Sequence, residues 1–127
     1  MKLIIAYFQP ERLTDVKQAL FRADVTKFSV TTARGCGAQR GYHERYRGTD
    51  VQIDLLPKAR IEVAVNDAFL QPTIDAIIEA ARTEEPNHDP DQDDDGGGGV
   101  GDGKIFVMPL DDCIRIRTGE RGSPAVG

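Results

Sequence analysis

The spacing of apolar residues along the chain predicts four β-strands and two helices. In the strand segments the residues are continuously apolar or alternate between apolar and polar, and β-branched and aromatic types are common. In the helical segments apolar residues recur every three or four positions, which places them on one face. The predicted strands span 1–8, 28–33, 58–65 and 105–110, and the predicted helices span 13–23 and 70–81.

This order, strand-helix-strand-strand-helix-strand, is that of the ferredoxin-like α+β fold: βαββαβ, an antiparallel sheet with two helices on one face. Asn66 or Asp67 could cap the second helix, whose start is left open by Pro72. The second and third strands carry apolar residues on both faces. We therefore expect the helix-free face of the sheet to be covered by another copy of the chain.

Charge is distributed unevenly along the chain. The net charge is −5, yet seven acidic residues and no basic ones fall within 84–99, where prolines and four consecutive glycines also lie. Outside this segment, 16 basic residues face 14 acidic ones. The segment should be a solvated insertion outside the core, whose negative field opposes an incoming anion at low salt. The mildly basic remainder favours a small anionic ligand.

Size and cysteine content narrow the class of protein further. A chain of 127 residues is most simply one domain, here 1–127. No apolar run approaches the length of a membrane span, so we expect a cytoplasmic protein. Cys36 and Cys113 are isolated in the sequence, which favours neither a disulfide nor a cysteine metal site.

A phosphate site is indicated near the C-terminal end. Residues 101–104 read Gly-Asp-Gly-Lys and lead directly into a strand, where glycines allow close backbone approach and turn N–H groups can bind an anion. Arg115 and Arg117 lie two apart in an alternating segment, so that in a strand they would point the same way. A lysine and two arginines of this kind suit a polyphosphate, most simply a nucleotide.

With these motifs in place, the chain resembles the P-II family of nitrogen-regulatory signal-transduction proteins, in particular archaeal members. Residues 46–50 and 54–62 are similar to the family's T-loop and its return strand, here about 36–57. Residues 101–107 match its B-loop signature, about 100–104, and 115–120 match its C-terminal loop, about 111–122. The acidic insertion, about 84–99, would suit a halophilic organism.

The resemblance implies a homotrimer that binds ATP or ADP, and AMP in some cases, in each cleft between subunits. The residues implied at the nucleotide are Ser29, Gly35, Gly37, Gln39, Glu62, Ala64, Gly101, Asp102, Gly103, Lys104, Arg115 and Arg117. Magnesium and 2-oxoglutarate would join ATP at the base of the T-loop. The residues implied there are Gln39, Gly41 and Lys58, with Gln39 also serving the metal.

The resemblance also implies an output surface and partners. Target proteins, an ammonium transporter or glutamine synthetase, would dock on the T-loop, and the transporter would recruit the protein to the inner face of the membrane. The implied docking residues are Tyr46, Arg47, Gly48, Thr49, Asp50 and Val51. No nucleic-acid partner is expected.

The sequence departs from the family at three functional positions. Ala38 replaces an arginine near the phosphates, and Val51 replaces the tyrosine that many bacterial members have uridylylated. Gly97 stands where the B-loop signature has a serine or threonine, four residues before Gly101. One phosphate contact, one modification site and one hydroxyl are therefore expected to be missing.

Two other classes of function are compatible with the fold. A nucleotide cleft could hydrolyse ATP slowly, although only Asp102 and Glu62 could act as bases beside the phosphates. The same fold also carries RNA-recognition modules, which need aromatic residues on the central strands. Here Tyr7 and Phe106 are the candidates, and the acidic segment would repel RNA. We expect a sensor and not an enzyme.

Overall fold

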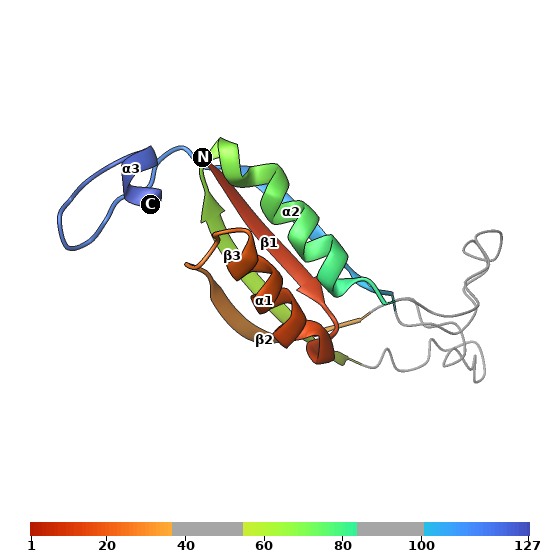
Figure 1. The fold of residues 1–127 in the computed structure, drawn as a ribbon. Helices are drawn as coiled ribbons and strands as arrows, with labels where there is room; N and C mark the ends of the chain where they lie inside the picture. Colours follow the sequence, from red (N-terminus) through yellow and green to blue (C-terminus); the bar gives the residue numbers. More distant parts are fainter. Residues whose placement is uncertain (37–54, 84–100) are drawn as a thin grey trace, which may run out of the picture.

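A computed structural model describes residues 1–36, 55–83 and 101–127, and in it the predicted order of elements is confirmed (Figure 1). One antiparallel sheet has the strand order β2-β3-β1-β4. The strands are β1 (Lys2–Phe8), β2 (Ser29–Gly35), β3 (Leu56–Val65) and β4 (Gly103–Pro109). The helices are η1 (Pro10–Arg12), α1 (Leu13–Arg22), α2 (Asp67–Ala81) and α3 (Ser123–Val126).

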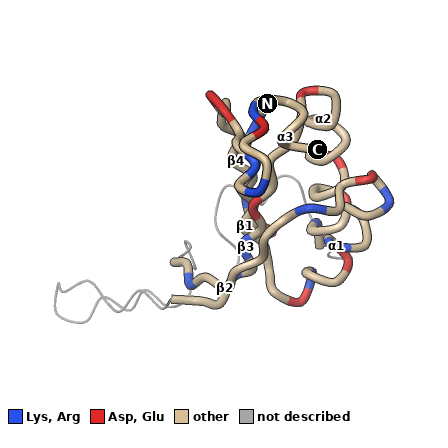
Figure 2. The backbone as a smooth tube through the Cα atoms, turned by 90° about the vertical axis from the view of Figure 1, so that its left-hand side faces the viewer, with Lys and Arg blue, Asp and Glu red and all other residues tan. Residues whose placement is uncertain are grey.

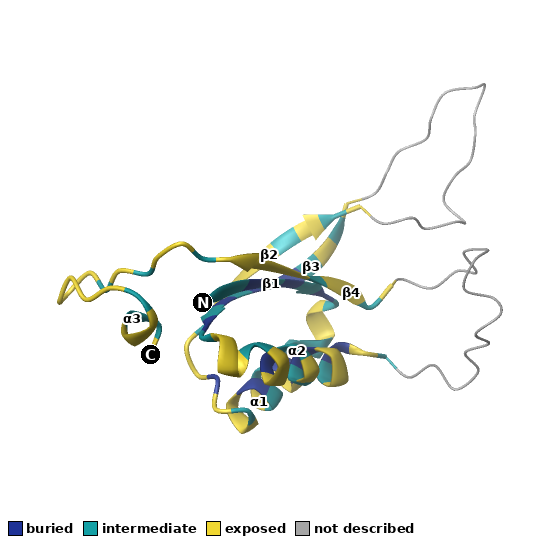
Figure 3. Cartoon of the chain, turned by 90° about the horizontal axis from the view of Figure 1, so that it is seen from above, coloured by how far each residue is buried: buried dark blue, intermediate teal, exposed yellow. Residues whose placement is uncertain are grey.

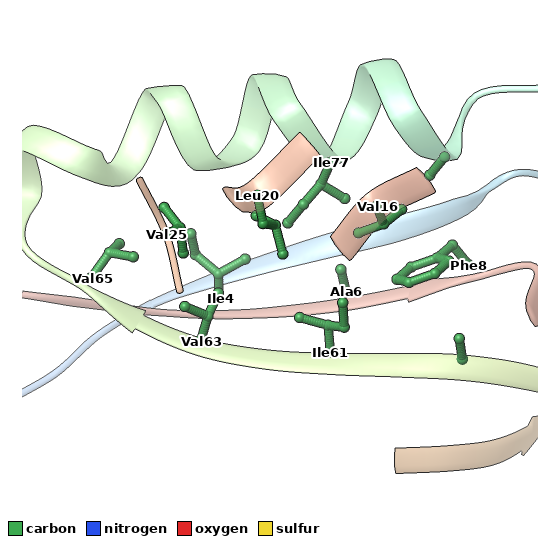
Figure 4. Close-up of a cluster of buried hydrophobic side chains, with 12 residues drawn as sticks. Ile4, Ala6, Phe8, Val16, Leu20, Val25, Ile61, Val63, Val65 and Ile77 are labelled. Carbon is green, nitrogen blue, oxygen red and sulfur yellow. The ribbon is translucent and has the colours of Figure 1, made fainter. Parts of the chain in front are cut away.

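Helices α1 and α2 pack on one face of the sheet and enclose the core (Figures 3 and 4). Alternate residues of β1 and β3 point toward the helices and are buried, as the strand period of two requires. From the helices, Val16, Leu20 and Ile77 fill the space between the layers. The fully buried hydroxyl of Thr73 donates to the Phe69 carbonyl at 2.6 Å, which satisfies the one buried polar side chain of the described part.

The helix-free face of the sheet is open to solvent within one chain. Its apolar residues come from β1 and β4: Leu3 and Ile5 pair across the ladder with Met108 and Phe106, which are 38% and 47% exposed. The prediction that β2 and β3 carry apolar residues on both faces is confirmed only in small part, by Ala33, Leu56 and Ala64 on this open face. Those strands contribute mainly polar side chains to it, because their apolar residues alternate onto the helix side.

The start of α2 resolves the question raised by Pro72. The helix begins at Asp67 and continues through Pro72. Asn66 occupies the cap position, but neither it nor Asp67 caps with its side chain. The Asn66 amide donates to the Ser123 carbonyl at 3.1 Å, and the Asp67 carboxylate accepts from the Met1 ammonium at 2.9 Å. Both side chains therefore tie the helix start to the two ends of the chain.

Stability should depend on the protonation state of Asp67. Its pKa is lowered below the ordinary value of 3.8, first by the hydrogen bond from the Met1 ammonium and then by the charge of Lys2. A lowered pKa contributes stability above 3.8 that is lost as the pH falls through the folded-state value. We expect Asp67→Asn to flatten the acid limb of the unfolding free energy measured by urea denaturation. Asp75→Asn, also on α2, is the control, and an unchanged limb would contradict this reading.

The segment after β4 does not take the extended form in which Arg115 and Arg117 would point the same way. Residues 114–117 do not form a strand: Ile114 makes a single bridge to Arg121, and residues 116–118 form a turn. Residues 123–126 form α3, held by the Asn66 amide on Ser123 and by Arg115, which donates to the Pro124 carbonyl at 3.2 Å.

None of the described helices is both long and apolar enough to span a membrane.

Candidate functional site

The predicted phosphate turn, residues 101–104, lies where β1 ends and β4 begins. Gly103 pairs with Phe8 and has a φ of +117°, which L-residues rarely adopt. A Cβ atom at this position would lie 1.8 Å from the Tyr7 carbonyl oxygen. Only glycine fits, so the local sequence requirement is steric. Gly101, by contrast, has open space where a Cβ would be.

Two side chains outside the turn contact it directly. The Thr83 hydroxyl, just beyond the end of α2, donates to the Asp102 carboxylate. The Gln9 amide, between β1 and η1, donates to the Gly101 carbonyl at 3.4 Å. Sequence reasoning missed both residues. Counting four residues back from Gly101 gave Gly97 and no hydroxyl. The hydroxyl beside the turn belongs to Thr83, which precedes the insertion.

Lys104 is the last residue of the predicted turn and already lies in β4, on the open face of the sheet. It pairs with Tyr7, which in turn pairs with Arg60 on β3. The Lys104 side chain has no hydrogen-bond or ion-pair partner within the described part of the chain. An exposed ammonium beside a glycine turn, with no partner among the described residues, is available to an anion.

A polar and aromatic network lies next to Lys104. Arg60 donates to the Tyr7 hydroxyl at 3.2 Å and to the Glu62 carboxylate at 2.9 Å. These bonds, that to Tyr7 first, raise the pKa of Arg60, so it stays charged. The Tyr7 ring meets Phe106 edge-on, with centroids 6.2 Å apart. Neither Tyr7 nor Arg60 was predicted at the nucleotide site, although strand alternation alone places them on the face of Lys104 and Glu62.

The residues implied at the adenosine share this open face. Ser29 and Glu62 are direct partners across β2 and β3, and Ala64 follows two residues on, opposite Leu3. Gly35 and Lys58 lie at the other end of this pair of strands: a Cβ at Gly35 would approach the Lys58 Cγ at 3.4 Å. Gly35 and Lys58 are thus at the same end of the sheet as the 101–104 turn, beside the start of segment 36–57.

The segment between β4 and α3, which contains Arg115 and Arg117, lies beyond the opposite end of the sheet (Figure 1). From Lys104 to Pro109, β4 advances about 17 Å at the usual rise per residue. The chain then turns away from the sheet. Arg115 is paired with Glu120 at 3.1 Å, whereas Arg117 is exposed and has no partner among the described residues. One chain therefore does not bring its arginines to its own phosphate turn.

The loop that carries the arginines is preformed and projects from the body of the subunit. The Gly119 amide donates to the Arg115 carbonyl at 2.8 Å, and the Gly122 amide donates to the Cys113 carbonyl at 2.9 Å. Ile116, between the two arginines, is 100% exposed. A fully exposed isoleucine next to an unpaired arginine is the arrangement expected of a segment that contacts a second subunit.

Several predicted residues lie outside the described residues. They are Gly37, Gln39 and Gly41, and the T-loop residues Tyr46, Arg47, Gly48, Thr49, Asp50 and Val51. Among the residues that the structure does describe, no three His, Cys, Asp or Glu side chains gather as a metal site. Basic and acidic positions of this part are interspersed along the backbone (Figure 2), consistent with the excess of acid lying in 84–99.

Comparison with known proteins places the whole arrangement in one family. The family model described as "Nitrogen regulatory protein P-II" matches residues 1–120. The chain is 45% identical over 126 residues to nitrogen regulatory protein GlnK1 of Methanosarcina mazei, covering 99% of this chain and 97% of that one. It is 44% identical, with the same coverage, to nitrogen regulatory protein P-II 2 of Methanothermobacter thermautotrophicus. It is 41% identical to nitrogen regulatory protein P-II of Azospirillum brasilense, covering 99% and 100%. The chain belongs to the P-II family of nitrogen regulatory proteins, which act in signalling and are not enzymes.

Proposed function

We propose that this nitrogen regulator is a homotrimer that senses ATP and ADP, and 2-oxoglutarate together with Mg-ATP. The observation that carries the proposal is the split site. The phosphate turn and Lys104 lie at the end of the sheet where β1 ends, and the segment between β4 and α3, with the exposed Arg117, lies beyond the other end. A second copy can supply the arginine, and the open sheet face with Phe106 and Met108 supplies apolar area for self-association.

In this proposal the nucleotide lies across the open face at a subunit boundary. Its phosphates take the N–H groups of the 101–104 turn and the Lys104 ammonium, and Arg117 of the next copy completes their neutralisation. By resemblance, the adenosine lies along Ser29, Gly35, Glu62 and Ala64, which share the same face. AMP, with one phosphate, would make fewer of these contacts.

The 2-oxoglutarate end lies at the base of segment 36–57. Lys58 supplies a charge for a carboxylate, and its stem rests on Gly35 at the start of that segment. By resemblance, Gln39 and Gly41 complete the site, with the Gln39 amide oxygen on magnesium. We infer that the bound ligands set the conformation of the T-loop. A ligand can shift the loop only by as much as its affinity differs between the loop conformations.

The output of the sensor is the T-loop, residues 36–57, docking on a regulated partner. An ammonium transporter, glutamine synthetase or both are the proposed targets, and no nucleic acid is needed. The protein would work in the cytoplasm and reach the membrane only through a transporter. Since Val51 carries no hydroxyl, uridylylation at that position is chemically impossible.

Calorimetric titration and native mass spectrometry together test this proposal. We expect a trimer that binds ATP and ADP competitively, with up to three nucleotides per trimer. We expect 2-oxoglutarate to bind well only when Mg-ATP is present. A protein that stays monomeric, or that binds 2-oxoglutarate equally well alone and with Mg-ATP, would contradict the proposal.

Gln39→Ala should separate the two ligands. It removes the proposed magnesium ligand and should abolish most 2-oxoglutarate binding while leaving ADP affinity within about twofold, because ADP binding does not use the metal end of the site. Titration of both ligands on one preparation gives the comparison. Gln52→Ala, in the same segment, is the matched control and should bind both ligands normally. If Gln39→Ala weakened ADP and 2-oxoglutarate binding equally, Gln39 would not act only at the metal and 2-oxoglutarate end of the site, and this assignment would be wrong.

A further inference from the structure

On its N-terminal side, the phosphate turn is joined to helix α2 by a long stretch of chain. Helix α2 ends at Ala81, and residues 84–100 separate Thr83 from Gly101. A connection of that length restrains its ends weakly, because the entropy of closing a loop grows with the number of residues in it. Contacts that the turn makes with the described residues therefore matter for its position.

The contacts that fix the turn come from both sides of it. On one side Gly103 is paired in β4 opposite Phe8. On the other, the Thr83 hydroxyl donates to the Asp102 carboxylate, and the Gln9 amide donates to the Gly101 carbonyl. Thr83 is itself held close to the helix, since the amide of the preceding residue, Arg82, donates to the Ile78 carbonyl at 3.0 Å.

We infer that Thr83 is a positioning residue for the phosphate site and acts through Asp102. Its hydroxyl joins the two ends of the 84–100 insertion, so the turn stays attached to the end of α2 whatever lies between them. This inference rests on the proposed nucleotide site and adds to it a residue that makes no proposed contact with the ligand.

The hydrogen bond also has an electrostatic consequence. Asp102 lies two residues from Lys104, close enough in sequence for a freed carboxylate to pair with that ammonium. Lys104 has no ion-pair partner among the described residues, and Thr83 holds the Asp102 carboxylate on the α2 side of the turn. Without the hydroxyl, Asp102 would compete with phosphate for Lys104 and place a negative charge beside the ligand.

The test compares Thr83→Val, which keeps the shape and removes the donor, with Thr83→Ser, which keeps the donor. Mg-ATP is titrated calorimetrically, and hydrogen exchange of the 101–107 backbone amides is followed without ligand. We expect Thr83→Val to weaken Mg-ATP about tenfold and Thr83→Ser to stay within about twofold. Amide exchange in the turn should rise in the valine variant alone. Thr14→Val, an exposed threonine of α1, is the control for the substitution itself.

The outcomes separate this inference from the proposed function. Unchanged exchange and unchanged affinity in Thr83→Val, or equal losses in the valine and serine variants, would overturn the role of the hydroxyl. If the unmodified protein bound no Mg-ATP, the proposed function would fail, while the exchange data would still decide whether Thr83 holds the turn.

A second pair of variants tests whether the Thr83 hydroxyl restrains the turn in the way that a short loop between Thr83 and Gly101 would. Deleting residues 85–97 brings the ends of the insertion together covalently. In that background Thr83→Val should cost less than about threefold in Mg-ATP affinity, because the shortened chain now restrains the turn. The same tenfold loss with and without the deletion would contradict the claim that the hydrogen bond joins the insertion's ends.

Discussion

Gly103→Ala is expected to abolish measurable ATP binding and to lower the free energy of unfolding by about 3 kcal/mol. The new Cβ would overlap the Tyr7 carbonyl oxygen, 1.8 Å away, and the backbone would keep a φ that alanine adopts only under strain. To relieve the overlap, the start of β4 must move away from β1, and the turn N–H groups move with it. Urea denaturation and ATP titration measure the two effects.

Gly101→Ala is the matched control for this prediction. It adds the same methyl group two residues earlier, where nothing lies within 4 Å. It should change the unfolding free energy by less than about 0.5 kcal/mol. Similar losses in both variants would show that flexibility of the turn, and not the close approach at Gly103, is what the glycines provide.

Lys104→Ala and Arg117→Ala should each weaken ATP by about 1.5–3 kcal/mol, the range for hydrogen bonds to charged groups. Both side chains lack a protein partner among the described residues, so neither substitution breaks an existing contact of the fold. Lys27→Ala and Arg121→Ala remove the same kinds of charge elsewhere, the latter within the same C-terminal loop. They should leave the affinity within about twofold, as calorimetry can check.

If Lys104→Ala and Arg117→Ala bound ATP as tightly as the unmodified protein, the assignment of the phosphate site would be wrong. If only Lys104→Ala weakened ATP binding, the 101–104 turn would remain assigned to the phosphate site and the C-terminal loop would not.

The fold could be predicted from sequence because its periodicities are local. The alternation in 58–65 and the helical stripe in 70–81 each report a face that is buried in the structure. What failed was the segment with Arg115 and Arg117, where alternation of Ile114 and Ile116 resembled a strand. Ile116 is fully exposed within one chain, so its apolar character reports no burial in the chain's own core.

The candidate site was located from its sequence motifs, whereas most of the contacts between its residues were not predicted. The glycine and lysine of 101–104 predicted a turn leading into a strand. In the structure the strand is present and begins within that stretch, at Gly103, with Gly101 and Asp102 just before it. Thr83 was missed because spacing along the chain was counted through the insertion, whereas its contact with Asp102 is spatial. Tyr7 and Arg60 were missed because each looks like an ordinary strand residue until cross-strand pairing sets them beside Lys104 and Glu62.

The central claim, that two subunits share each nucleotide site, is tested most directly by mixing defective subunits. Lys104→Ala and Arg117→Ala chains, carrying different tags, are co-expressed, and mixed trimers are purified through both tags. A boundary that pairs the intact Lys104 of one chain with the intact Arg117 of the other should recover normal ATP affinity. Every mixed ring of three chains has one boundary with this pairing, so about a third of its sites should be restored, although neither variant alone has a site of normal affinity. If mixed trimers recovered no tight sites, Lys104 and Arg117 would not act on the same nucleotide from different subunits, and the account would be wrong.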